Sequence, residues 1–493
     1  MKCNRVATAS ALGLVLVSLA AFGCDSDDSV DPSPTDGGQG GSGGRGGSAP
    51  TAGKNAFPSG GSTADAGAAG GEPIADGGEV GAGGAAGGAP GAEEGRLVIA
   101  DTNAATLYIY SVPALEQLAI IDDVKFADHA GFLPLNDGRV LLTDSATNEL
   151  ISLRVLGDEP GVTGRAGLTY PAIHLAVDPA HEYAAISGAG PAAGEPGAFT
   201  LVRLGDFYHR SVSIPTGEPG LLLGGSPLHL YHRNDDPAQV EAYLFEDLWK
   251  GTVSLKGSVA IGAAPHGEAL AHADGKMFVA ADDGINVIPT DGAELGEVTQ
   301  IPYDLDGKTG GRAFYARLSS DAKYLYSYLR DSGPNYDWAW KDWVSDAYVV
   351  DIQNETAKRI EVGKGLVYRL ADSEKYAVFV QYHPDGDFAH FMDTDPESDT
   401  FQEIVAKVPL EKMSKTPTGP DADPWSSEAF RMAGMVPSGR YAFVSHGGDG
   451  KVSMIDTARM EVAGEIELPT PLNYGGYLLG VEPGAVVRDT VAR

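Results

Sequence analysis

Short apolar runs separated by Gly, Pro, Asp and Asn fill the sequence from residue 96 to residue 493. The stretch from Pro265 to Ala281 shows the pattern most fully, with an apolar run, the turn Asp274-Gly275 and a second apolar run. Two such runs joined by an Asp-Gly turn predict a β-hairpin. Helical periodicity is nearly absent from this part of the chain, so we expect an all-β fold.

The same hairpin recurs along the chain at intervals of 37 to 62 residues. A repeat of this length, built from short strands, is typical of the four-stranded blades of a β-propeller. We expect each hairpin to supply the innermost strand of one blade and the strand after it. The hairpins start near His129, His174, His229, His266, Arg317, Arg369 and Arg431.

The two ends of the repeated region are complementary. Three strands are predicted at its start, over Arg96–Ala100, Thr106–Val112 and Glu116–Ile121, and a single strand, Tyr474–Val481, is predicted at its end. Pairing these terminal strands would complete one more blade and leave no open sheet edge. The sequence therefore predicts eight blades. Seven blades is the alternative, because the shortest interval between hairpins can reflect one blade that is divided incorrectly.

The N-terminal segment indicates export. A basic start with Lys2 and Arg5 precedes an apolar run from Ala11 to Phe22, which is too short to span a membrane and is typical of a signal peptide. The sequence Leu19-Ala-Ala-Phe-Gly-Cys24 resembles a bacterial lipobox. This resemblance implies cleavage before Cys24 and lipid attachment to its thiol; an ordinary signal peptide is the alternative. The chain would then be a lipoprotein of the bacterial cell envelope, facing the periplasm or the cell surface.

Three segments follow from this pattern: a lipoprotein signal peptide at 1–23, lipidated Cys24 with a linker at 24–95, and the propeller at 96–493. The linker is rich in Gly, Ala and Ser and lacks the apolar side chains of a core, so we expect a disordered tether. The net charge of −33 argues against nucleic acid as a partner. We expect a monomer that contacts the membrane through Cys24.

Candidate chemistry lies at the start of the hairpins. Four of the eleven histidines occupy this position, and each precedes the next strand by nine or eleven residues, a difference that keeps the side chains on one strand face. We expect these imidazoles to face one another across the axis of the ring, at one mouth of its channel. They are His129, His174, His229 and His266.

Converging imidazoles suit zinc, which favours nitrogen ligands in a tetrahedral arrangement. Asp128 and Glu268 stand beside two of the histidines and could add an oxygen ligand or orient a ring. In the alternative interpretation, each His only caps its strand through a backbone carbonyl. The next three hairpins carry arginine near the same position, so this second arc could bind a carboxylate or phosphate instead. These arginines are Arg317, Arg369 and Arg431.

Two resemblances to known families follow from these motifs. The stretch Lys451-Val-Ser-Met-Ile-Asp-Thr457 resembles the repeats of YVTN-type bacterial propellers. The stretch Pro265-His-Gly-Glu-Ala269, with the other hairpin histidines, resembles the periplasmic zinc metallochaperones that serve zinc uptake transporters. This second resemblance implies zinc binding at the channel mouth and a metal transporter or another envelope protein as partner. The nearly His-free linker departs from the metal-gathering segment that such proteins can carry.

The sequence therefore favours a non-catalytic, chaperone-like zinc-binding propeller in the cell envelope. Two alternatives remain: a metal-dependent propeller hydrolase of lactones or esters, and a protein-binding scaffold without metal. The common catalytic motifs, such as Gly-x-Ser-x-Gly and His-Glu-x-x-His, are absent, but the same histidines could hold a zinc-bound water. Whether the chain is an enzyme is left open by the sequence.

Overall fold

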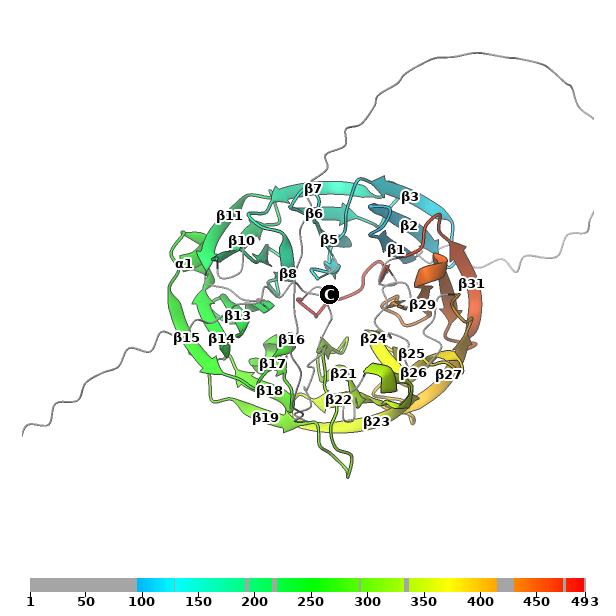
Figure 1. Cartoon of the computed structure of the whole chain (residues 1–493). Helices are drawn as coiled ribbons and strands as arrows, with labels where there is room; N and C mark the ends of the chain where they lie inside the picture. The colour runs from blue at the N-terminus through cyan, green and yellow to red at the C-terminus, as the bar shows by residue number, and fades with distance from the viewer. Residues whose placement is uncertain are drawn as a thin grey trace, which may run out of the picture. The chain divides into compact units, whose positions relative to one another are not determined.

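A computed structural model describes residues 95–491, apart from 128, 191–194, 215–219, 292–293, 332–336, 415–429 and 473–475. Its strands form eight four-stranded antiparallel sheets arranged as blades around a common axis (Figure 1). The all-β fold and the eight blades predicted from the hairpin repeats are confirmed. The predicted signal segment, Cys24 and Asp128 lie outside the described residues, as does the linker up to residue 94.

The first four blades in chain order have these strands, from the innermost outward. They are β4 (Leu133–Pro134), β5 (Arg139–Asp144), β6 (Glu149–Arg154) and β7 (Gly161–Gly167); β8 (Ala172–Val177), β9 (Tyr183–Gly188), β10 (Gly197–Arg203) and β11 (His209–Ile214); β12 (Gly220–Gly224), β13 (His229–Asp235), β14 (Ala238–Leu244) and β15 (Leu255–Ala260); and β16 (His266–Ala271), β17 (Lys276–Ala280), β18 (Gly284–Pro289) and β19 (Thr299–Pro302).

The remaining blades follow the same order. Their strands are β20 (Arg317–Leu318), β21 (Tyr324–Asp331), β22 (Val344–Asp351) and β23 (Thr356–Lys364); β24 (Leu366–Asp372), β25 (Tyr376–Tyr382), β26 (Asp387–Asp393) and β27 (Ile404–Leu410); β28 (Ala433–Met435), β29 (Tyr441–His446), β30 (Lys451–Asp456) and β31 (Glu461–Glu467); and β32 (Tyr477–Val481), β1 (Gly95–Asp101), β2 (Thr106–Val112) and β3 (Gln117–Asp122).

Helical segments are short within the described part of the chain. They are α1 (Phe245–Trp249) and the 3₁₀ turns η1 (His272–Asp274), η2 (Asp337–Asp342) and η4 (Gly447–Asp449). Among the described residues, no helix is long and apolar enough to cross a membrane.

The last blade closes the ring as predicted. The C-terminal strand β32 is its innermost strand and pairs antiparallel with β1, with Leu479 opposite Val98. Because the first and last parts of the chain share one sheet, the ring has no open edge at its terminus. The buried side chains of this sheet form one apolar cluster with those of its two neighbouring blades.

The hairpin turns form as their sequence predicts. Gly138, Gly275 and Gly439 follow the inner strands β4, β16 and β28, and each has a positive φ, between 58° and 81°. Glycine adopts this conformation without the penalty of a Cβ atom. All inner strands run the same way along the axis, so we call the end where they begin the N-terminal face and the end with these turns the hairpin face.

The predicted start of the third blade is wrong. His229 opens β13, which is the second strand of this blade, and the inner strand is β12. Gly220, the first residue of β12, lies 46 residues from both His174 and His266, so the corrected spacing is even. The run Gly-Leu-Leu-Leu-Gly has no alternation of polar and apolar residues, and the turn after it has Gly-Ser-Pro in place of Asp-Gly. This strand therefore lacks both features by which the other hairpins were recognised.

The C-terminal segment after β32 crosses the centre of the hairpin face (Figure 1). Its backbone N–H at Val487 donates to Asn136 Oδ1 (2.7 Å), in the turn after β4. Its carbonyl at Thr490 accepts from the N–H of Val177 (2.9 Å), at the end of β8. Thr490 and the last described residue, Val491, are both buried. This segment therefore ties separate blades together on the face opposite the predicted site.

Candidate functional site

Two of the predicted ligands meet at the N-terminal face. His174 lies near the start of β8 and Glu268 near the start of β16, and both inner strands have a β-bulge just before these residues. The side chains come within 3.8 Å of each other, from His174 Nδ1 to Glu268 Oε1. They are 3% and 0% exposed, although they belong to blades that are not adjacent in the ring. The site thus brings together residues 94 positions apart.

An arginine from the blade between them fixes the carboxylate. Arg233, on β13, donates from Nε to Glu268 Oε2 (3.0 Å) and from Nη1 to the carbonyl of Pro265 (2.7 Å). It also contacts the carboxylate of Asp235. Because Arg233 and Glu268 are fully buried, their opposite charges offset much of the cost of removing each from water. One carboxylate oxygen is thereby held by arginine, and the other is directed at His174.

A glycine makes room for this ion pair. A Cβ atom added to Gly220, at the start of β12, would lie 2.6 Å from Arg233 Nε and 2.7 Å from Glu268 Oε2. Any side chain at this position would therefore push the guanidinium and the carboxylate apart. The inner strand of this blade carries no side chain at its start, and its contribution is the space that Arg233 of the same blade and Glu268 of the next blade occupy.

The other three histidines are placed differently. His229 Nδ1 lies 2.7 Å from the carbonyl oxygen of Pro227, which matches the capping alternative. His129 is an exposed turn residue ahead of β4. His266 begins β16, and its Nδ1 lies 3.2 Å from the carbonyl oxygen of Phe314. The expectation that four imidazoles share one strand register is wrong for His229, because that residue is on a second strand.

We next consider whether these residues fit a zinc ion. Zinc bonded to one imidazole nitrogen and one carboxylate oxygen at about 2.0–2.2 Å, with a tetrahedral angle, holds these two atoms roughly 3.4 Å apart. The observed separation of 3.8 Å between His174 and Glu268 is close to this value. Among the described residues, however, no group of three or more His, Cys, Asp or Glu side chains is arranged to hold a metal ion. The pair supplies part of a zinc site.

The three arginines predicted as anion ligands have different surroundings. Arg317 lies near the hairpin end of its strand, where its Nη1 is 3.4 Å from Asp489 Oδ2 of the C-terminal segment. Arg369 stacks over the ring of Tyr315 at 5.1 Å and donates to the sulfur of Met432. Both are half-buried; Arg317 is the first residue of β20, and Arg369 lies in the middle of β24.

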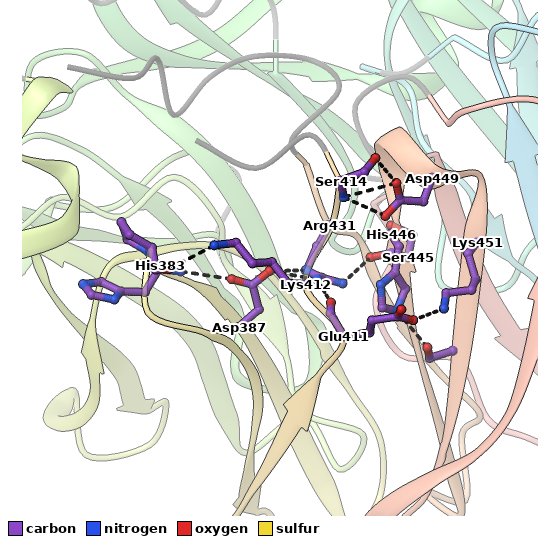
Figure 2. Close-up of polar contacts among 12 residues, drawn as sticks. His383, Asp387, Glu411, Lys412, Ser414, Arg431, Ser445, His446, Asp449 and Lys451 are labelled. Carbon is purple, nitrogen blue, oxygen red and sulfur yellow. Dashed lines mark hydrogen bonds and ion pairs between the residues drawn. The ribbon is translucent and has the colours of Figure 1, made fainter. Parts of the chain in front are cut away.

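Arg431 has a different environment, which Figure 2 shows. It is fully buried, and its Nε and Nη2 donate to Asp387 Oδ2 at 2.9 and 2.8 Å. The other oxygen of Asp387 accepts the backbone N–H of His383 (3.1 Å). Arg431 also donates to the carbonyl oxygens of Ser445 and Glu411. Arg431 therefore joins two neighbouring blades, with a carboxylate of the protein itself as its partner.

Arg233 is the site residue that sequence reasoning missed. The run His229-Leu-Tyr-His-Arg233 places a charged residue in a strand that is otherwise buried, and this was a usable signal. A buried arginine in a strand requires a carboxylate partner, and Glu268 is only 35 residues away in the chain.

Comparison with solved structures places the chain among β-propellers. It is similar to AztD of Citrobacter koseri, with TM-scores of 0.56 and 0.54 for two structures, 13% sequence identity, and coverage of 80% of this chain and at least 99% of AztD. It is also similar to the dihydro-heme d1 dehydrogenase NirN, with a TM-score of 0.51, 15% identity, and coverage of 79% of this chain and 75% of NirN. No family model and no curated protein matches the sequence. At these identities the likeness establishes the class of fold, an eight-bladed propeller.

Proposed function

We propose that the propeller is a non-catalytic binding protein that holds zinc at its N-terminal face, with His174 and Glu268 as ligands. The observation that carries the proposal is the 3.8 Å approach of a buried imidazole nitrogen to a buried carboxylate oxygen, from two blades. The resemblance of Pro265–Ala269 and the hairpin histidines to periplasmic zinc metallochaperones also supports the proposal. A zinc transporter of the cell envelope is the partner that this role implies.

His266, two residues before Glu268 on β16, is a further candidate ligand that would have to move toward the pair to share its zinc. Its Nδ1 is within hydrogen-bond distance of the Phe314 carbonyl, which selects the tautomer with a proton on Nδ1 and a lone pair on Nε2. Metal-binding histidines commonly have such a partner on their second nitrogen. His129 is retained as a possible ligand from the neighbouring turn, whereas His229 is omitted because its ring is held by the Pro227 carbonyl.

Zinc titration of the full chain, purified without a His tag, tests the proposal. We expect one tightly bound zinc per chain, measured by competition with a chromophoric chelator. His174→Gln should weaken the affinity at least tenfold, because it removes one of a few direct ligands. The matched control is His209→Gln, which changes an exposed imidazole on the outer strand β11. Equal affinities in these two variants would refute the proposed site.

The proposed setting is the bacterial cell envelope, with the lipid on Cys24, the segment 24–95 as tether and residues 96–493 as the functional unit. The lipobox-like sequence Leu19 to Cys24 supports this proposal. Metabolic labelling with a radioactive fatty acid tests it. The native chain should incorporate label and Cys24→Ser should not, whereas label in both would place the modification elsewhere.

A further inference from the structure

The C-terminal segment that follows β32, residues 482–491, runs over the centre of the hairpin face (Figure 1). It starts at the seventh blade, where the carboxylate of Glu482 accepts hydrogen bonds from the backbone N–H and the hydroxyl of Ser438 at 2.7 and 2.9 Å. It then reaches the first blade, where the N–H of Val487 donates to Asn136 Oδ1. The segment is therefore bonded to the hairpin turns of two blades before it reaches the axis.

The next residues of the segment lie on the axis of the ring. Asp489 Oδ2 is 3.4 Å from Nη1 of Arg317, in the fifth blade, which lies opposite the first blade in a ring of eight. Only one residue separates Asp489 from Val487, and adjacent Cα atoms are about 3.8 Å apart. Contacts with opposite blades from positions so close in the chain require this part of the segment to span the centre.

The end of the segment is fixed in the protein. The carbonyl of Thr490 accepts the N–H of Val177 at 2.9 Å, at the end of the inner strand of the second blade. Val491 forms an isolated antiparallel bridge with Ala176 of the same strand. Val491 also belongs to the apolar cluster of the third and fourth blades. Thr490 and Val491 are 2% and 4% exposed, whereas Val486 in the same segment is 62% exposed.

These contacts have a functional consequence. The blades of a propeller surround a central channel, and the two mouths of this channel lie on the two faces of the ring. A segment that crosses the centre and has its end buried fills the mouth on the hairpin face. Both its hydrogen bonds to separate blades and its buried apolar end are lost if it lifts away, so the closed arrangement is favoured.

We propose that the C-terminal segment is a plug that keeps the channel closed at the hairpin face. Solutes then exchange with the channel through the N-terminal face alone. His174 and Glu268 lie near the starts of their inner strands, at that face. A protein that delivers or accepts a ligand of this pair would dock on the N-terminal face; this consequence rests on the proposed zinc function, whereas the plug does not.

Thiol labelling tests whether the plug stays in place in solution. The sequence contains only Cys3 and Cys24, so replacing both with serine in the full chain gives a background without thiols. In native protein, Thr490→Cys should react with a maleimide at least about tenfold more slowly than Val486→Cys, because only the second position is exposed. In denaturant the two rates should be equal. Equal rates in native protein would overturn the proposal, since the end of the segment would then be free in solution.

A second thiol tests whether the plug covers the channel. Leu270 lies near the hairpin end of the inner strand β16, is 1% exposed and belongs to the same apolar cluster as Val491. Leu270→Cys should be protected in the full chain and should react in a chain that ends at Glu482. The control, Leu255→Cys, is 52% exposed on the outer strand β15 and should react equally in both chains. Protection of residue 270 in both chains, or reaction in both, would overturn the proposal.

Circular dichroism and thermal unfolding of each variant separate loss of the plug from loss of the fold. If the chain that ends at Glu482 does not fold, Val491→Asp in the full chain replaces it in the same comparison. A charge is costly to bury in an apolar cluster, so this substitution should release the end of the segment. All of these measurements are made without metal, so their outcome does not depend on the proposed zinc site.

Discussion

Two buried arginine–carboxylate pairs join neighbouring blades, and they differ in one respect. In the Arg431–Asp387 pair, arginine occupies one carboxylate oxygen and a backbone N–H occupies the other. In the Arg233–Glu268 pair, arginine binds one oxygen, while the other lies 3.8 Å from an imidazole nitrogen, beyond hydrogen-bond distance. The first carboxylate is fully used in holding the fold together. The second is positioned by the fold and directed at a group that binds metals.

The comparison separates stability from function, and the largest predicted effect is on stability. Arg431→Ala should lower the free energy of unfolding by about 3–5 kcal/mol, because Asp387 would remain charged in a buried site. The measurement is chemical denaturation of the full chain. Zinc affinity should be unchanged. The double variant Arg431→Met/Asp387→Leu, which removes both charges, should lose much less stability; an equal loss would show that packing dominates there.

The stability of the protein should also depend on pH through His446, a histidine near Arg431. Burial, with Arg431 and Lys451 nearby, lowers the pKa of His446 to about 3. The unfolded chain therefore binds a proton at this residue below about pH 6.5 and the folded chain does not, so stability falls as the pH drops from 6.5 towards 3. Between pH 7 and pH 4.5, the titration of His446 should lower the free energy of unfolding of the native protein by about 2–3 kcal/mol.

The variant His446→Gln isolates this contribution. Denaturation curves at pH 7 and pH 4.5 should show that the stability difference between native protein and variant shifts in favour of the variant at the lower pH. A constant difference at the two pH values would mean that His446 titrates normally in the folded protein.

The Arg233–Glu268 pair can be disturbed without changing either partner. Gly220→Ala should cost about 1–3 kcal/mol of stability, because the added methyl group overlaps both side chains. It should also weaken zinc binding, since Glu268 would no longer be held in place. Gly205→Ala, at a position with no atom within 4 Å of the added Cβ, is the matched control. Unchanged zinc affinity in Gly220→Ala would argue that the carboxylate needs no positioning.

The smallest effect on the free energy of unfolding is expected from a substitution on the hairpin face. Arg317 and Asp489 are 25% and 20% exposed and 3.4 Å apart, so their ion pair is screened by water. Asp489→Asn should therefore change the free energy of unfolding by less than about 1 kcal/mol. A loss comparable to that of Arg431→Ala would show that the C-terminal segment depends on this contact for its attachment.

The sequence predicted the fold well because its signals are local. Hairpin turns such as Asp137-Gly138 and the complementary terminal strands are readable within a few residues, and they led to eight blades. The error at His229 came from an inner strand without alternation, Gly220–Gly224. In that blade the more recognisable second strand was taken as the first.

The candidate site was predictable only in part. His174 and Glu268 were both identified, but their pairing requires the ring to bring distant strands together, which local spacing does not encode. The partner of Arg431 was not predicted for the same reason, because Asp387 is 44 residues away and belongs to another blade. The position of a turn in the chain can be inferred from sequence. How deeply a charged side chain is buried, and which way it points, depends on the neighbouring blade.

The most direct test of the central claim is anomalous scattering at the zinc edge, from crystals of the full chain grown with one equivalent of zinc. The account predicts a single strong peak about 2.0–2.2 Å from an imidazole nitrogen of His174 and a carboxylate oxygen of Glu268. A peak confined to acidic residues on the outer strands, or no peak at all, would contradict it.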